Sequence, residues 1–516
     1  MESLLPLLQY DVLIPWLLGI VFGVFVGSTP GLTATMAVAL LVPFTFYLPN
    51  PNTGLALILG MSFTAIFAGD IPAVYLRIPG TPASATGTLD GHPMALAGKG
   101  RRALTLDLGC SVLGGIVGTA LLWILAPQLA RFALRFSHYE YFWLGVAGLA
   151  ISAVVTQGPA VRGMMGALLG MLLATVGIDR VSGTPRFTWG QPELAGGIDF
   201  IAVMIGLFGL GEVLRNVRRG SEAKTRLPPE EGGAGFLEMV RDMARHKLLL
   251  IRSALLGTGV GVLPGAGADI AAWASYGVAQ RTSRTPERFG KGCVEGVMAP
   301  STANNAAVAG AWIPALVFGI PGDSITAVAL GALLMYDIKP GPLVFEQNPG
   351  QMRSILLIAF ITQFLLIPAG WIGIRAFGWV VRLPRAALVT SVIVFSVVGS
   401  YSLRNSLFDV WVALAAGVVG VILEARGIPP APLILGLILG PMIEDNLRTG
   451  LIKSQGDFTP FLTRPLCLAL IALMVSAALL PRWLRRLRTG PPRGPVSGGT
   501  GDTSTETSTP TPELPP

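Results

Sequence analysis

Pro-Gly pairs lie inside apolar segments of this chain, and hydroxyl-bearing residues surround them. Pro30-Gly31 lies within S-T-P-G-L-T-A-T, and Pro79-Gly80 is followed by T-P-A-S-A-T-G-T. Because proline lacks a backbone N–H and glycine permits the backbone angles that end a helix, we expect a helix to stop and restart at each pair. A restarting helix presents free N–H groups and a partial positive charge, which suit a small carboxylate. The alternative is a kink or re-entrant loop whose hydroxyls bond only to their own backbone.

Two further Pro-Gly pairs, in the second half of the chain, are accompanied by acids. Pro264-Gly265 is followed by A-G-A-D, which ends at Asp269, and Pro321-Gly322 is followed by D-S-I-T, which begins at Asp323. A carboxylate within an apolar segment is costly unless it is paired, protonated or bound to a cation, so Asp269 could hold a coupling cation or carry a proton. The alternative role for Asp269 is a carboxylate that caps a helix N-terminus.

Two adjacent asparagines, Asn304 and Asn305, lie in the small-residue segment A-P-S-T-A-N-N-A-A. Their carbonyl oxygens suit Na⁺ and their amide groups suit a carboxylate, although the same side chains could bond between packed helices instead. The predicted cation ligands are Asp269, Asn304, Asn305 and Asp323. The predicted substrate-binding residues are Thr29, Pro30, Gly31, Thr33, Gly80, Thr81, Ser84, Pro264, Gly265, Gly267, Gly322, Ser324 and Thr326.

The elements that must position these residues are membrane helices. Hydrophobic residues make up 52% of the 516 and charged residues 13%, against about 25% charged residues in soluble domains. The fold class is therefore an all-α polytopic membrane protein with roughly 10 to 14 membrane segments, some of them broken or re-entrant at the Pro-Gly pairs. The net charge of +8 comes from basic clusters between apolar segments, which orient a chain in the bilayer and do not indicate nucleic acid.

Segments of the first half return in the second half in the same order. I-P-A-V-Y-L-R-I-P-G at Ile71 to Gly80 returns as I-P-A-L-V-F-G-I-P-G at Ile313 to Gly322. The other matches pair Gly27 to Met36 with Gly261 to Ile270, and Gly166 to Gly170 with Gly436 to Gly440. This pattern predicts two homologous halves with a site at the broken helices. The repeat is inverted if an odd number of spans separates the halves.

A polar, basic stretch divides the halves. The predicted domains are a first membrane repeat over 1–214, a cytoplasmic linker with an amphipathic helix over 215–247, a second membrane repeat over 248–489 and a disordered tail over 490–516. The linker and the cluster R-W-L-R-R-L-R near the C-terminus are basic, so we expect both to be cytoplasmic. The three histidines and three cysteines are too scattered for a metal site. No catalytic or nucleotide-binding motif is present, so we expect no cofactor and no enzyme.

Long motifs along the chain resemble a known family, and they lie at Gly27–Pro43, Ile78–Met94, Gly183–Gly190, Gly261–Ala268, Ala299–Ala307, Ile320–Val328 and Pro429–Gly436. They are similar to the large membrane subunit of the tripartite tricarboxylate transporters, TctA type. The resemblance implies a secondary transporter in the bacterial inner membrane that imports citrate-like carboxylates with a Na⁺ or H⁺ gradient. It also implies two partners, a small membrane subunit and a periplasmic solute-binding protein. Asp323 follows the second I-P-G, where an acid would repel a carboxylate unless a cation lies between them.

The function expected from these observations is uptake of a small carboxylate, received from the binding protein, at a site between the two halves. Two alternatives differ in class. A membrane-embedded enzyme acting on a lipid-linked substrate should show clustered acids or histidines near one interface, and a passive anion channel should show rings of charged residues along its pore.

Overall fold

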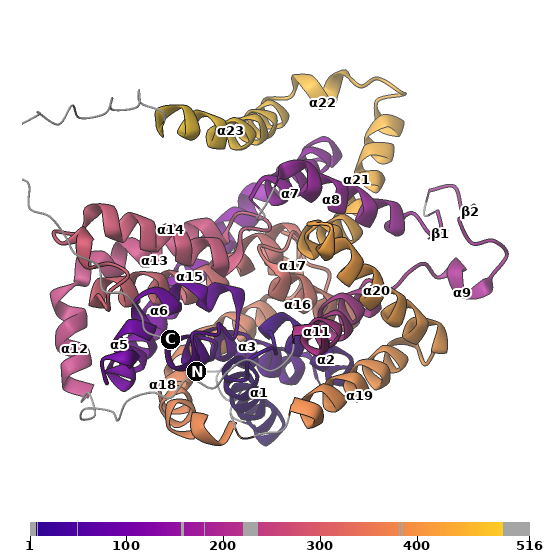
Figure 1. Ribbon diagram of the computed structural model, residues 1–516. Coiled ribbons are helices and arrows are strands. Elements are labelled where there is room, and N and C mark those ends of the chain that lie inside the picture. The colour runs from indigo at the N-terminus through magenta and orange to yellow at the C-terminus, as the bar shows by residue number, and fades with distance from the viewer. Residues whose placement is uncertain are drawn as a thin grey trace, which may run out of the picture.

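The computed structural model describes residues 7, 9–48, 50–155, 159–179, 181–219, 236–380, 382 and 385–488, and these residues are mostly α-helical (Figure 1). Six of the described helical segments are long and apolar enough to cross a membrane, namely Tyr10–Ser28, Pro51–Leu76, Gly100–Ala133, Pro349–Val380, Ala386–Arg404 and Leu407–Ala425. These helices confirm an all-α polytopic membrane protein. The larger expected number of segments stays a prediction, since several other apolar helices are shorter.

The first half of the chain contains most of the short helices. Its elements are α1 (Tyr10–Ser28), α2 (Ala34–Thr45), α3 (Pro51–Ala68), α4 (Asp70–Leu76), η2 (Pro82–Thr86), α5 (Gly87–Leu96), α6 (Gly100–Ala133), α7 (His138–Val155), α8 (Ala160–Ala174), β1 (Gly177–Ile178), β2 (Pro185–Arg186), α9 (Pro192–Ala195), α10 (Phe200–Met204), the π-helical η3 (Ile205–Leu210) and α11 (Gly211–Arg219).

Helix α12 (Phe236–Arg245) lies within the predicted linker. The elements of the second half are α13 (Lys247–Gly261), α14 (Gly267–Thr282), η4 (Pro286–Arg288), α15 (Val294–Phe318), α16 (Ser324–Met335), α17 (Val344–Gln347), α18 (Pro349–Val380), α19 (Arg385–Arg404), α20 (Leu407–Ala425), α21 (Pro430–Lys453), α22 (Thr459–Thr463) and α23 (Pro465–Arg488).

Two helices, α3 and α15, form the centre of the molecule. The apolar window of α3 and α4 is 94% buried, and α15 is buried from Gly296 to Val317. Each packs closely against the helix that opens its half, because glycines of α1 and α13 leave no side chain between the backbones. The glycine contacts are Gly23 with Met61, Gly27 with Ala65, Gly257 with Ala303 and Gly261 with Ala307.

The amphipathic helix predicted in the linker is α12, which packs against α6. Arg102 of α6 forms ion pairs with Glu238 at 3.1 Å and Asp242 at 2.8 Å. The predicted linker boundary at residue 215 falls within α11, where Arg215 pairs with Glu212 and with Glu424 of α20. Residues 220–235 of the linker and the predicted tail over 490–516 lie outside the described residues.

The short hairpin of β1 and β2 projects at one side of the molecule (Figure 1). It is fixed to α21 by charged groups, because Arg448 donates to both carboxylate oxygens of Asp179, at 2.6 and 2.7 Å. Together with the Ser182 hydroxyl, this guanidinium holds the pKa of Asp179 below its usual range.

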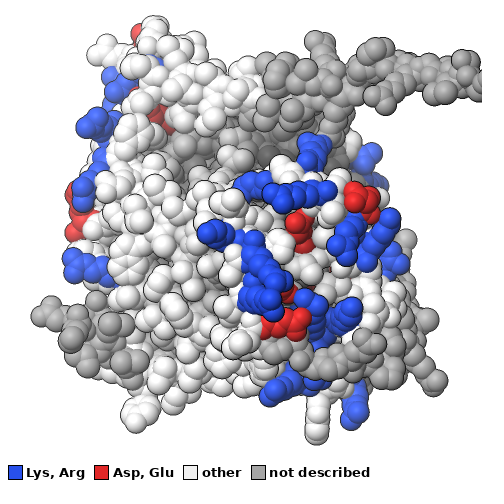
Figure 2. All heavy atoms as spheres, turned by 90° about the vertical axis from the view of Figure 1, so that its left-hand side faces the viewer, with Lys and Arg blue, Asp and Glu red and all other residues white. Residues whose placement is uncertain are grey.

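Figure 2 shows the face of the molecule at the left of Figure 1. Lys and Arg side chains form a band at one edge of this face and a larger group nearer its middle. The strip between them carries almost no charge, as expected where a protein faces a membrane.

Candidate functional site

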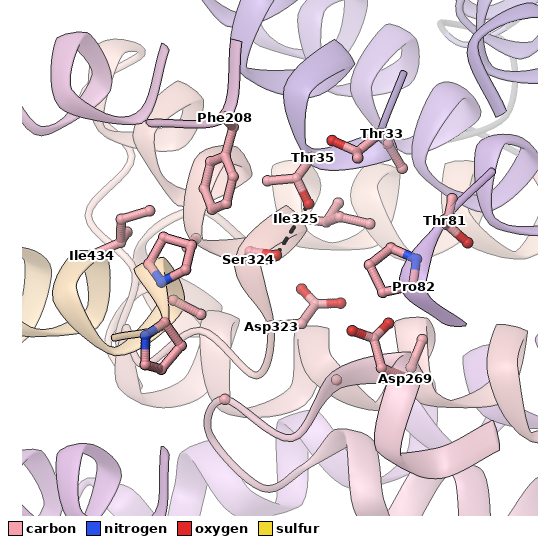
Figure 3. Close-up of a pocket in the computed structure, with 18 of the residues that line it drawn as sticks. Thr33, Thr35, Thr81, Pro82, Phe208, Asp269, Asp323, Ser324, Ile325 and Ile434 are labelled. Carbon is pink, nitrogen blue, oxygen red and sulfur yellow. Dashed lines mark hydrogen bonds between the residues drawn. The ribbon is translucent and has the colours of Figure 1, made fainter. Parts of the chain in front are cut away.

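A cavity of about 420 Å³ lies where several helices begin (Figure 3). The first residues of α2, α14, α16 and α21 line it, together with the start of η2. Helix N-termini carry unpaired N–H groups and a partial positive charge. Their convergence directs positive helix ends toward a cavity whose lining has no Lys or Arg and three acids, Asp269, Asp323 and Glu424.

The first Pro-Gly pair of each half ends one helix and starts the next. Gly31, with φ of 89°, separates α1 from α2, and Gly265, with φ of 76°, separates α13 from α14. A side chain at either position would be strained in this left-handed region. Thr33 then caps α2, because its hydroxyl oxygen accepts a hydrogen bond from the Met36 N–H at 3.2 Å.

The second pair of each half packs against the first. A Cβ built on Gly80 would overlap the Gly27 carbonyl oxygen, and one built on Gly322 would lie 2.5 Å from the Gly261 carbonyl oxygen. In the second half the two breaks are also bonded, since the Gly265 N–H donates to the Gly322 carbonyl at 2.8 Å. The two loops of each half therefore pack against each other beside the cavity.

Hydroxyl groups join the two halves across this cavity. The Thr35 and Ser324 hydroxyl oxygens lie 3.0 Å apart and share a hydrogen bond (Figure 3). Thr81 lines the cavity as well, and its hydroxyl oxygen lies 2.7 Å from that of Ser84, which is fully buried behind it. The cavity therefore offers hydroxyls from both halves that can donate to a bound anion.

Two carboxyl groups point toward one another at the cavity wall, those of Asp269 and Asp323 (Figure 3). Asp323 caps α16, because its Oδ1 accepts hydrogen bonds from the Thr326 N–H and hydroxyl, each at 2.7 Å. Asp269 lies in the first turn of α14, which has no side-chain cap. Two facing carboxylates repel each other unless a cation or a proton lies between them.

A second cavity of about 780 Å³ continues from the first, because both are lined by Thr33, Thr35, Thr81 and Ser324. This larger space also contains Pro30, Gly31 and Gly80, and it carries the charged residues Arg77, Glu212, Arg215 and Glu424. Of the predicted substrate-binding residues, those that line one of the two cavities are Pro30, Gly31, Thr33, Gly80, Thr81, Gly265, Gly267 and Ser324.

Other predicted residues support the cavity without lining it. The Thr29 hydroxyl donates to the Phe25 carbonyl at 2.7 Å and so stays on its own helix. Neither cavity is lined by Ser84, Pro264, Gly322 or Thr326, although each is close in sequence to a lining residue. Asn304 and Asn305 are buried within α15, which continues through Pro300 without a break, and neither lines the two cavities.

Several lining residues were not among the predicted site residues. Thr35 belongs to the same T-A-T run as Thr33, so its hydroxyl was a visible signal. Phe208, on the π-helical turn η3, and Pro430, at the start of α21, come from distant parts of the chain and reach the cavity only through tertiary packing.

Comparisons with known proteins agree with the resemblance seen in the motifs. The sequence model of the tripartite tricarboxylate transporter TctA family matches residues 13–435. An uncharacterized 52.8 kDa protein in the TAR-I ttuC′ 3′ region of Agrobacterium vitis is 37% identical over 469 residues, which cover 90% of this chain and 92% of that protein. An uncharacterized protein in the TAR-II ttuC′ 3′ region of the same organism is 38% identical over 228 residues, covering 44% of this chain and 94% of that protein. No solved structure matches the chain.

These matches exclude the alternative of a membrane-embedded enzyme, because the family is one of transporters. A multi-pass membrane protein with a cavity at its broken helices is consistent with that assignment. The chain belongs to the TctA family, the membrane subunits of tripartite tricarboxylate transporters.

Proposed function

We propose that this protein imports small carboxylates, citrate or related organic acids, by secondary active transport, and that the cavity at the helix N-termini binds the substrate. The observation that carries this proposal is the convergence of α2, α14, α16 and α21, all by their N-terminal residues, on one cavity. Backbone N–H groups and hydroxyls bind an anion firmly enough to orient it and weakly enough to release it, in contrast to a fixed Arg or Lys. A volume of about 420 Å³ is suited to a small organic acid.

The coupling cation is proposed to bind between Asp269 and Asp323. Their facing carboxylates supply negative charge beside the positive helix ends (Figure 3). A Na⁺ or H⁺ there removes the repulsion between these acids and a bound carboxylate, so each ligand favours binding of the other. Cation and substrate would then move together.

The two halves are proposed to be an inverted repeat that exposes the cavity alternately to the two sides of the membrane. Matching glycine contacts between α1 and α3 and between α13 and α15 support the similarity of the two halves. The remaining parts of the system are a periplasmic binding protein that delivers the acid and a small membrane subunit. The setting is the bacterial inner membrane, with the linker and the C-terminus on the cytoplasmic side.

Uptake into proteoliposomes that contain this chain and the small membrane subunit, supplied with the binding protein, tests the proposal. Radiolabelled citrate and shorter di- and monocarboxylates are offered under an inward Na⁺ gradient, an inward H⁺ gradient or neither. We expect at least one acid to accumulate above its external concentration only when a gradient is present. Removal of the bridging hydroxyls by T35V and S324A should lower uptake, while T282A, at an exposed hydroxyl of α14, should not. Gradient-independent equilibration would indicate a passive channel instead.

A further inference from the structure

A second group of buried polar side chains lies along one face of α6, away from the cavity lining. Asp107 and Ser111 are one turn apart on this helix and are 2% and 1% exposed. Among the described residues, Asp107 Oδ2 and Ser111 Oγ have no hydrogen-bond partner. One further turn along, at Gly115, a built Cβ would overlap Oε1 of Gln363 from α18, another buried oxygen without a partner.

The neighbouring helices add further oxygens to the same face. Asp70, the first residue of α4, interacts electrostatically with Asp107, is 4% exposed and leaves Oδ2 unpartnered. Ser301 of α15 lies beside Asp107. One turn after Ser301 comes Asn305, which is fully buried and has neither amide atom bonded.

The orientation of α15 places Asn305 toward α6. A Cβ built on Gly114 of α6 would overlap the Thr302 carbonyl, and one built on Gly118 would lie 2.8 Å from the Ala306 carbonyl oxygen. The Gly118 Cβ would also lie 2.9 Å from Ala309 Cβ. Asn305 comes three residues after Thr302 and four before Ala309, so it lies on the face of α15 that packs against α6.

Nearly all of these unpartnered atoms are oxygens that accept hydrogen bonds or bind cations. An unpaired buried polar group costs on the order of 1–3 kcal/mol, and in a membrane protein such groups mark ion pathways. None of the described Lys, Arg or His residues forms an ion pair with Asp70 or Asp107. Small hard cations bind oxygen ligands of this kind, carboxylate, hydroxyl and amide carbonyl.

We propose that Asp70 and Asp107, together with Ser111 and Asn305, form a buried site for a monovalent metal cation, with Na⁺ as its ligand. The site is separate from the pair of acids in the cavity, and it uses one residue, Asn305, whose predicted role was cation binding. Binding of Na⁺ here does not depend on the proposed function. The role of the site in driving carboxylate uptake does rest on that function.

A pair of hydroxyls connects this site to the cavity. Ser84 interacts with the carboxylate of Asp70, and its hydroxyl oxygen lies 2.7 Å from that of Thr81 in the cavity wall. A hydroxyl has a single proton to donate. When Asp70 carries no cation, Ser84 donates to Asp70 and Thr81 donates to Ser84. When Na⁺ neutralises Asp70, Ser84 donates to Thr81, and the Thr81 hydroxyl is free to donate to an anion in the cavity.

Thermal unfolding of the purified full chain in lipid nanodiscs, followed by tryptophan fluorescence, tests the site without any carboxylate. NaCl is titrated at constant ionic strength against choline chloride. We expect the unfolding temperature to rise with Na⁺, and D70N and D107N each to raise the half-saturating Na⁺ concentration at least tenfold. The matched control is D337N, at an exposed residue with φ of 56°, a left-handed conformation that asparagine tolerates equally well. D337N should respond as the wild type does.

Two further variants keep the test decisive. In choline alone, D107N should unfold at the wild-type temperature or above it, because it removes a buried unpaired charge, and this shows that the variant folds. N305A retains both carboxylates and should weaken Na⁺ binding less than D107N does. The inference is wrong if the wild type shows no Na⁺ response, or if D70N and D107N respond normally while D269N alone loses the response. A Na⁺ response without carboxylate uptake would keep this site and overturn the transport proposal.

Discussion

At Gly322 the loop beside the proposed substrate site packs directly against the backbone of neighbouring helices. Its replacement by alanine adds a single carbon, and that carbon would lie 2.5 Å from Ala311 Cα and 2.5 Å from the Gly261 carbonyl oxygen. Ordinary carbon contacts lie at about 3.5–4.0 Å, so one partner must shift by roughly 1 Å. Both partners are backbone atoms of buried helices, which leaves no flexible side chain to move instead.

The free-energy cost of this overlap can be taken from the cost of adding methyl groups to other well-packed protein cores. Added methyl groups in well-packed cores cost about 1–3 kcal/mol, which corresponds to about a 5- to 150-fold change in an equilibrium constant. Gly322 accepts the hydrogen bond of the Gly265 N–H at 2.8 Å and lies two residues before Ser324. The strain therefore falls on both Pro-Gly breaks of the second half. We expect carboxylate affinity to weaken within that range while the protein still assembles in the membrane.

Equilibrium binding of the transported acid to purified G322A, with uptake in proteoliposomes, measures the effect. G277A is the control, because a Cβ at Gly277 in α14 meets nothing within 4 Å, and alanine favours a helix by about 1 kcal/mol over glycine. G80A is expected to behave as G322A does, since it overlaps Gly27 in the same way. If G322A binds and transports like G277A, the breaks do not determine the geometry of the site.

Two further predictions concern other parts of the molecule. Asp409 is fully buried and paired with Arg404, whose Nε lies 2.9 Å from its Oδ2. R404A should therefore cost about 3–5 kcal/mol of stability by leaving a buried charge unpaired, while R353A, at an exposed arginine, should leave the unfolding temperature unchanged. Equal unfolding temperatures for both variants would show that the pair contributes nothing. S84A should still be stabilised by Na⁺, but Na⁺ should enhance its carboxylate affinity much less than in the wild type or in T88A. Undiminished coupling in S84A would exclude the hydroxyl connection.

The sequence was most informative where the backbone itself is unusual. Proline and glycine act locally, so the ends of α1 and α13 and the starts of α2 and α14 could be predicted from Pro30-Gly31 and Pro264-Gly265 alone. The residues that begin a new helix, such as Thr33 and Ser324, then line the cavity because a helix start exposes its first side chains and N–H groups together.

The sequence did not predict in which direction a side chain points from its helix, or which distant segments pack at the cavity. Thr29 lies next to Pro30, yet its hydroxyl donates to the Phe25 carbonyl. Whether this hydroxyl faces the cavity or its own helix depends on the residue at which α1 ends, which the motif alone does not give. Asn304 and Asn305 lie in the long helix α15, and the packing of that helix, which the local sequence does not indicate, keeps both out of the cavity lining. Phe208 reaches the cavity through packing of η3 on α20, and nothing near it in the sequence indicates that.

The glycine contacts between opening and central helices have a mechanical consequence. A carbonyl of α3 that rests in the notch left by Gly23 or Gly27 blocks axial sliding of α1, since the next residue along carries a side chain. The same interlock holds α13 against α15 through Gly257 and Gly261. Each pair of helices therefore moves as one rigid unit that carries its Pro-Gly loop at one end. If the cavity opens, each helix pair must rotate as a rigid body together with its Pro-Gly loop.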